Sequence, residues 1–91
     1  MIIMADELLK FTGRECPHCN DMNPLDERLE KELKVKIKSI EVWHNAANAK
    51  LMEKYDRGFC GGVPFYFNTK TGQWICGAVP YETLKKWALG K

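Results

Sequence analysis

Two cysteines three positions apart stand where a largely apolar run changes into a helical pattern. The run 8–11 precedes Cys16-Pro17-His18-Cys19, and apolar residues at spacings of three and four follow. This order places Cys16 at a helix N-terminus, where free backbone N–H groups and the helix dipole favour a thiolate. One turn of helix brings Cys19 close enough to form a disulfide with Cys16. The tetrapeptide therefore predicts a pair that cycles between dithiol and disulfide.

Composition places the chain among ordinary globular proteins. It has 91 residues, 45% of them hydrophobic and 29% charged, with a net charge of +2. We expect one domain over residues 1–91, and no nucleic-acid partner, because lysines and glutamates alternate in the densest basic stretch. No run reaches the roughly 18 apolar residues of a membrane span, and residues 1–7 do not resemble a signal peptide. We therefore expect a cytoplasmic monomer that does not associate with membranes.

Periodicity and turn signals predict seven elements in the order βαβαββα. Helices are then available for both faces of a four-stranded mixed sheet, so the fold class is α/β. Pro24 is expected to bend the first helix, separating a short first turn from a longer body. The expected elements are a strand at 8–12, a helix at about 16–33, a strand starting near Ile37, a helix capped by Asn45 and stopped by Gly58, a hairpin of strands at 65–67 and 74–76, and a helix from Pro80 to Gly90.

Five landmarks in this order resemble the thioredoxin superfamily, and the element order is similar to its minimal, glutaredoxin-sized form. The resemblance covers nearly the whole chain. The landmarks are Phe11, the Cys16-Pro17-His18-Cys19 motif, Pro24, Gly62-Val63-Pro64 and Gly77-Ala78.

The resemblance implies roles for five residues. Cys16 would be the attacking thiol and Cys19 the resolving one. The proline that matches Pro64 is cis in that family and lies against the active-site disulfide. Val63 would then offer its backbone N–H and C=O to an extended substrate segment, and Gly77 would keep that groove open.

The dipeptide Pro17-His18 resembles the one in bacterial periplasmic thiol oxidases, although their large helical insertion is missing here. Both residues are predicted to tune the acidity of the first thiol. His18 can stabilise the Cys16 thiolate by charge and hydrogen bonding. A more stable thiolate makes the disulfide a stronger oxidant. We therefore predict a pair more oxidising than that of ordinary thioredoxin.

Three positions depart from the pattern that this resemblance implies. Lys10 replaces a buried acidic residue, so it either stabilises a thiolate from inside the protein or points to solvent. Glu15 replaces a tryptophan before the first cysteine, which alters the docking surface. No acidic pair follows Gly77, which disfavours specificity for glutathione. His44 has no evident partner and is interpreted as a loop or cap residue.

The other two cysteines have two interpretations. Cys60 and Cys76 fit free, half-buried small hydrophobes. Under the resemblance they would instead line the rim of the active-site groove, where one of them would serve as a secondary thiol. A zinc site is the alternative for the first pair, although no second close pair exists. Its remaining ligands would come from His18, His44, Cys60 or Cys76.

The aromatic residues divide into core and surface candidates. Phe65, Phe67, Trp74 and Trp87 are expected in the core. Trp43 lies on the loop expected to flank the active site, where an exposed aromatic side chain contributes to partner docking.

These observations predict a thiol–disulfide oxidoreductase that exchanges the Cys16–Cys19 couple with protein or small-molecule disulfides. No cofactor is needed, and we assign no metal ligands. The reductant would be thioredoxin reductase or glutathione. The alternatives are a non-catalytic binding or zinc-binding module of thioredoxin-like fold and a glutathione-linked glutaredoxin.

Overall fold

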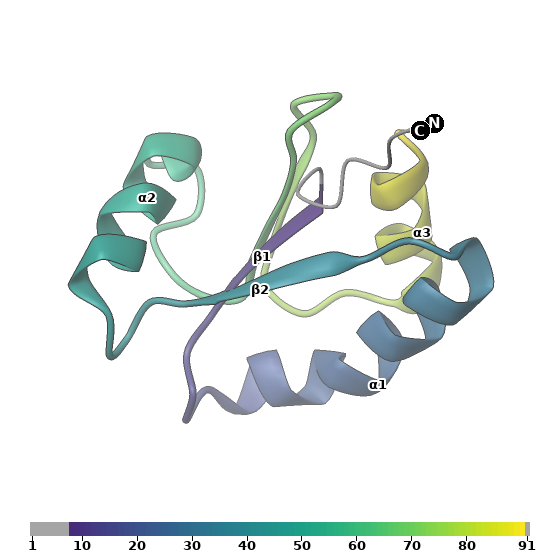
Figure 1. Cartoon of the computed structure of the whole chain (residues 1–91), viewed down its shortest axis with the longest axis horizontal. Coiled ribbons are helices and arrows are strands. Elements are labelled where there is room, and N and C mark those ends of the chain that lie inside the picture. The colour runs from purple at the N-terminus through teal and green to yellow at the C-terminus, as the bar shows by residue number, and fades with distance from the viewer. Residues whose placement is uncertain (1–7, 91) are drawn as a thin grey trace.

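The computed structural model describes residues 8–90 and contains the seven expected elements in the expected order (Figure 1). The predicted βαβαββα order and the α/β class are confirmed. Each predicted boundary falls within about two residues of the observed one. Residues 1–7, which were compared above with a signal peptide, lie outside the described residues. The elements are β1 (Leu8–Thr12), α1 (Pro17–Leu33), β2 (Ile37–Glu41), α2 (Ala46–Asp56), β3 (Phe65–Asn68), β4 (Trp74–Cys76) and α3 (Tyr81–Leu89).

The four strands form one mixed sheet in the order β2-β1-β3-β4. β1 is parallel to β2, whereas β3 is antiparallel to both β1 and β4. The register pairs Phe11 with Phe65 and Phe65 with Cys76. The end of β1, the start of β3 and the end of β4 therefore meet at one end of the sheet, where α1 begins.

Helices cover both faces of the sheet, as Figure 1 shows, with α1 and α3 on one side and α2 on the other. Every residue of β1 from Leu8 to Phe11 is buried, because this central strand is covered on both faces. Two clusters of buried side chains result. The cluster under α1 and α3 contains Leu8, Met22, Leu29, Ile37, Tyr66, Ile75, Leu84 and Trp87, and the cluster under α2 contains Leu9, Phe11, Ile40, Met52 and Phe65.

The helix ends follow the sequence signals closely. The Asn45 side chain caps α2 by accepting a hydrogen bond from the Asn48 N–H at 3.0 Å. α2 ends at Asp56 and is followed by Arg57 in the left-handed conformation, so the predicted stop at Gly58 lies two residues beyond the observed end. α1 runs through Pro24 as one helix of 17 residues. The predicted first turn and body are therefore parts of a single continuous helix.

One aromatic prediction is wrong. Trp74 is 41% exposed and stacks on Phe59 with ring centroids 4.9 Å apart. Side chains alternate along the edge strand β4, so Trp74 points to the face opposite the buried Ile75. Phe65 and Trp87 are buried as predicted. Among residues 8–90, no helix has both the length and the apolar character needed to cross a bilayer.

Candidate active site

Cys16 and Cys19 occupy the first turn of α1, and both are free thiols. Cys16 is the N-cap residue, and its Sγ accepts a hydrogen bond from the backbone N–H of Cys19 at 3.1 Å. A turn closed by the Cys16 N–H and the Gly13 carbonyl oxygen, 3.1 Å apart, brings the chain from β1 into the helix. The sulfur of Cys16 thus sits where backbone N–H groups stabilise negative charge.

Both thiols are more enclosed than the sequence suggests. Cys16 is 3% exposed and Cys19 is fully buried. Burial raises the pKa of Cys19, and the hydrogen bond with Cys16 raises it further. Cys19 is therefore a protonated thiol at neutral pH, suited to act second.

The segment before β3 lies against the first thiol. The Cys16 Sγ is 3.8 Å from the carbonyl oxygen of Val63. The peptide bond between Val63 and Pro64 is cis. The Gly77 N–H donates to the Pro64 carbonyl oxygen at 2.8 Å, and the space beside the Gly77 Cα is open. The structure thus brings Cys16, Val63, Pro64 and Gly77 to one end of the sheet.

The two residues between the thiols are exposed. Pro17 occupies the first position of α1, where a missing N–H costs nothing. His18 follows it in the same turn and faces solvent. The predicted influence of His18 on the couple remains a prediction.

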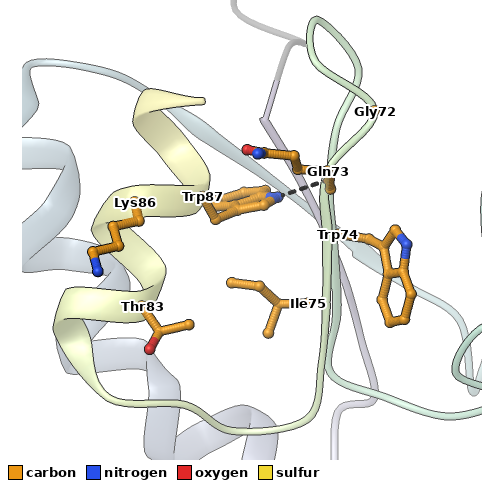
Figure 2. Close-up of a pocket in the computed structure, with 7 residues that line it drawn as sticks. All are labelled: Gly72, Gln73, Trp74, Ile75, Thr83, Lys86 and Trp87. Carbon is orange, nitrogen blue, oxygen red and sulfur yellow. Dashed lines mark hydrogen bonds between the residues drawn. The ribbon is translucent and has the colours of Figure 1, made fainter. Parts of the chain in front are cut away.

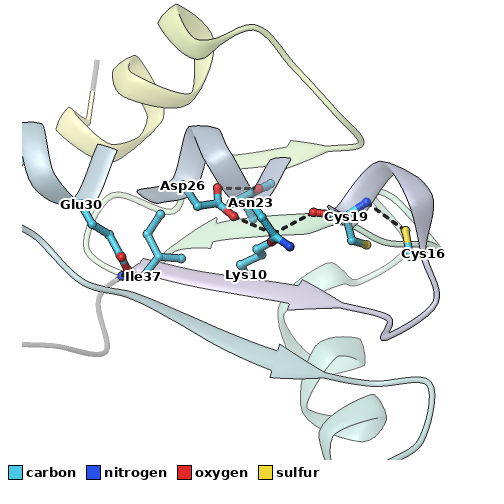
Figure 3. Close-up of polar contacts among 8 residues, drawn as sticks. Lys10, Cys16, Cys19, Asn23, Asp26, Glu30 and Ile37 are labelled. Carbon is cyan, nitrogen blue, oxygen red and sulfur yellow. Dashed lines mark hydrogen bonds and ion pairs between the residues drawn. The ribbon is translucent and has the colours of Figure 1, made fainter. Parts of the chain in front are cut away.

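Lys10 is buried behind the thiols, which excludes the solvent-facing interpretation. Figure 3 shows its ammonium between β1 and α1, and the residue is 1% exposed. Its Nζ donates to the Cys19 carbonyl oxygen at 3.1 Å, to Asn23 Oδ1 at 3.0 Å and to Asp26 Oδ2 at 2.6 Å. An ammonium group has three N–H donors, so every one is used.

Asp26 is a buried carboxylate that sequence reasoning missed. Its Oδ1 accepts a hydrogen bond from the Tyr66 hydroxyl at 2.9 Å, while its Oδ2 binds Lys10. Burial raises the pKa of Asp26 in spite of the Lys10 charge, and burial beside Asp26 raises the pKa of Tyr66. The available signal was position, since Asp26 falls on the same helix face as the buried Met22 and Leu29.

The loops beside the site carry a hydrogen-bonded histidine–glutamate pair and an indole ring. His44 does have a partner, because its Nε2 lies 2.7 Å from Glu15 Oε1. This hydrogen bond lowers the pKa of Glu15. Trp43 is 51% exposed and packs over Gly13, where a Cβ atom would lie 2.3 Å from the indole. These side chains form the rim next to Cys16.

Cys60 and Cys76 form a disulfide, so the prediction that both are free is wrong. Their Cα atoms are 5.4 Å apart, within the usual range for a disulfide. The sequence offered no sign of this pairing, because it depends on how the loop after α2 returns to the sheet. Cys76 ends β4 beside Gly77, and Cys60 lies three residues before Val63. The disulfide therefore borders the same end of the sheet as Cys16, as the rim interpretation expected.

Neither the protein-family models nor the curated proteins compared with this sequence include a match. The structure is similar to the crystal structure of the glutaredoxin (grx-1) from Archaeoglobus fulgidus, with a TM-score of 0.64. The likeness covers 90% of this chain and 85% of that chain, at 21% sequence identity. The fold is glutaredoxin-like. This confirms the thioredoxin-type fold that the order of landmarks predicted.

The arrangement of the described side chains bears on the zinc alternative. Within residues 8–90, no three His, Cys, Asp or Glu side chains come together as metal ligands. Cys60 and Cys76 are bonded to each other, so neither could join Cys16 and Cys19 around zinc unless the disulfide were first reduced.

A surface pocket of about 430 Å³ is lined by residues of β4, of the turn before it and of α3. Figure 2 shows it between β4 and α3, next to the hydrogen bond of 3.1 Å from Trp87 Nε1 to the Gln73 carbonyl oxygen. The Asn68 N–H donates to that same carbonyl oxygen, and Asn68 pairs with Leu8 at the start of β1. Gln73 is therefore at the end of the sheet opposite Cys16, and the pocket lining extends from there along β4 to Ile75.

Proposed function

We propose that this chain is a thiol–disulfide oxidoreductase in which Cys16 attacks a substrate disulfide and Cys19 resolves the product. The observation that carries the proposal is the N-cap position of Cys16, whose sulfur accepts the Cys19 N–H beside the Val63–Pro64 segment. Such a position supports a nucleophilic thiolate.

The reaction proceeds in two exchanges. The Cys16 thiolate attacks one sulfur of the substrate disulfide, and the other substrate sulfur leaves as a thiolate. The Cys19 thiol then loses its proton and attacks the Cys16 sulfur, which releases the second substrate thiolate and leaves a Cys16–Cys19 disulfide. Two electrons have passed to the substrate. A dithiol of thioredoxin reductase, or two glutathione molecules, would return the couple to the reduced form.

The surroundings of the couple fit this order of events. Burial keeps Cys19 protonated, so it does not compete with Cys16 for the substrate. The Lys10 ammonium holds the Cys19 carbonyl oxygen and so fixes the first turn of α1 while its sulfurs change partners. The backbone of Val63 and the open space beside Gly77 are the groups that we propose contact the substrate.

Cys16→Ser and Cys19→Ser variants test the proposal. We expect the wild-type protein to reduce insulin or a peptide disulfide with a suitable reductant, and Cys16→Ser to abolish turnover. Cys19→Ser should accumulate a mixed disulfide between Cys16 and the substrate, detectable by mass under non-reducing conditions. Turnover that survives in Cys16→Ser would refute the assignment.

The same preparations test the alternatives. Turnover supported by glutathione without thioredoxin reductase would favour a glutathione-linked enzyme. One equivalent of bound zinc together with no turnover would favour the zinc-binding module.

A further inference from the structure

The loop between α2 and β3, residues 57–64, shields the first thiol. The Val63 carbonyl oxygen lies 3.8 Å from the Cys16 Sγ, and Cys16 is 3% exposed. A substrate disulfide must bring a sulfur atom into line with the Cys16 sulfur before exchange can occur. Displacement of this loop would therefore widen the approach to the Cys16 sulfur.

Several attachments hold the loop in place, and one of them is the stacking of Phe59 on Trp74 of β4, with ring centroids 4.9 Å apart. At its start, the two carboxylate oxygens of Asp56 accept hydrogen bonds from the N–H groups of Cys60, at 2.6 Å, and Gly61, at 2.7 Å. At its end, the Gly77 N–H binds the Pro64 carbonyl oxygen. Between them, the Cys60–Cys76 disulfide ties the loop to β4.

The backbone itself gives the loop little rigidity. Gly58, Gly61 and Gly62 have no side chains to pack, and the first two adopt positive φ angles of 85° and 76°. Residues 57–64 contain no helix or strand. The disulfide is thus the one covalent attachment across this loop in the described part of the chain.

The disulfide is open to reagents. Cys76 is exposed and Cys60 is partly exposed. Exposed disulfides are the ones that exchange readily with external thiols. In a reducing compartment, such a bond is more typical of a redox-sensing pair than of a structural one.

We propose that Cys60–Cys76 is a second redox site, a latch that a dithiol reductant opens to release the loop over Cys16. One thiolate of the dithiol attacks the Cys76 sulfur, and Cys60 leaves as a thiolate. The second thiolate of the reductant then displaces Cys76, so the reductant becomes a cyclic disulfide and two electrons enter the protein. The freed loop exposes Cys16 to disulfides. This inference rests on the proposed function, since it regulates the same thiol.

The test uses the Cys19→Ser background, in which Cys16 cannot form its own internal disulfide. Iodoacetamide labels Cys16 in Cys19→Ser, with the latch closed, and in Cys19→Ser/Cys60→Ser/Cys76→Ser, with the latch removed. We expect labelling to be at least about fivefold faster without the latch, because access to the thiolate controls its reaction. Adding Cys16→Ser to the second variant must abolish labelling, which identifies the labelled residue.

A second measurement keeps the test independent of these substitutions. In Cys16→Ser/Cys19→Ser, the only disulfide is Cys60–Cys76, which dithiothreitol should reduce while the fold persists by circular dichroism. Amide hydrogen exchange at Gly61 and Gly77, whose N–H groups are bound to Asp56 and to the Pro64 carbonyl oxygen, should then accelerate at least about tenfold, with β1 amides unchanged.

Three outcomes would overturn the latch. These are equal or slower labelling of Cys16 without the disulfide, resistance of Cys60–Cys76 to dithiothreitol in the folded protein, and loss of β1 protection on reduction. Equal labelling rates would leave the oxidoreductase proposal standing if the wild-type protein still turns over. If labelling is faster without the disulfide but the wild-type protein shows no turnover, the latch is supported and the oxidoreductase proposal is refuted.

Discussion

The buried ion pair between Lys10 and Asp26 gives the sharpest prediction for stability. Lys10→Met removes the ammonium but keeps a side chain of similar length, so Asp26 Oδ2 loses its partner at 2.6 Å. The side chains are 2% and 12% exposed, so water cannot readily replace the lost contact. Removing one member of a buried pair costs about 3–5 kcal/mol. This is a large share of the roughly 5–15 kcal/mol that stabilises a typical domain.

The loss should depend on pH in a definite direction. Burial already raises the folded-state pKa of Asp26 above its unfolded value, and removal of Lys10 raises it further. A carboxyl group with a raised folded pKa binds its proton more tightly in the folded state. Stability therefore falls as the pH rises from the unfolded pKa, about 3.9, through the folded one. The deficit of Lys10→Met should be small at pH 4 and largest near pH 7.

Urea unfolding of three variants, compared with the wild-type protein, measures these effects. Lys10→Met/Asp26→Leu removes both charges and should recover at least about 2 kcal/mol of the loss, since no unpaired charge remains. Lys70→Met, at an exposed lysine of the β3–β4 turn, should change the free energy of unfolding by less than about 0.5 kcal/mol. A deficit below about 1 kcal/mol for Lys10→Met at pH 7, or one that does not grow between pH 4 and pH 7, would refute the reasoning.

Three further predictions concern other parts of the site. Cys60→Ser/Cys76→Ser should lose about 3 kcal/mol of the free energy of unfolding by urea, because the disulfide joins residues 16 positions apart; an unchanged midpoint would show that it constrains nothing. His18→Ala should lower the reduction potential of the active-site couple by roughly 30 mV in glutathione redox buffers, and an equal potential would contradict its predicted influence. Gly13→Ala should displace the Trp43 indole, change tryptophan fluorescence and cost about 1–3 kcal/mol, whereas an unchanged spectrum would contradict the close packing.

The sequence predicts features that depend on neighbours along the chain. The N-cap position of Cys16, the Asn45 cap and the hairpin of β3 and β4 all rest on residues a few positions apart, and the structure has each of them. The order of these local signals was enough to predict the element order, because short right-handed connections leave few arrangements.

Features that depend on distant segments could not be predicted in the same way. Lys10 and Asp26 are 16 positions apart and meet only because α1 packs on β1. The position of Asp26 on the helix face of Met22 and Leu29 indicates burial but does not identify its partner. Likewise, Cys60 pairs with Cys76 because the loop after α2 returns to the end of β4, a path that its glycines permit but do not specify.

The strand directions also determine where this module can be joined to something else. β1 begins at Leu8 beside Asn68, and Gly90 lies next to Thr71 of the β3–β4 turn. Both ends of the described chain therefore emerge on the side away from the sulfur atoms. A fluorescent tag, a solid support or a fused enzyme joined directly to Leu8 or Gly90 would therefore start on the side away from Cys16.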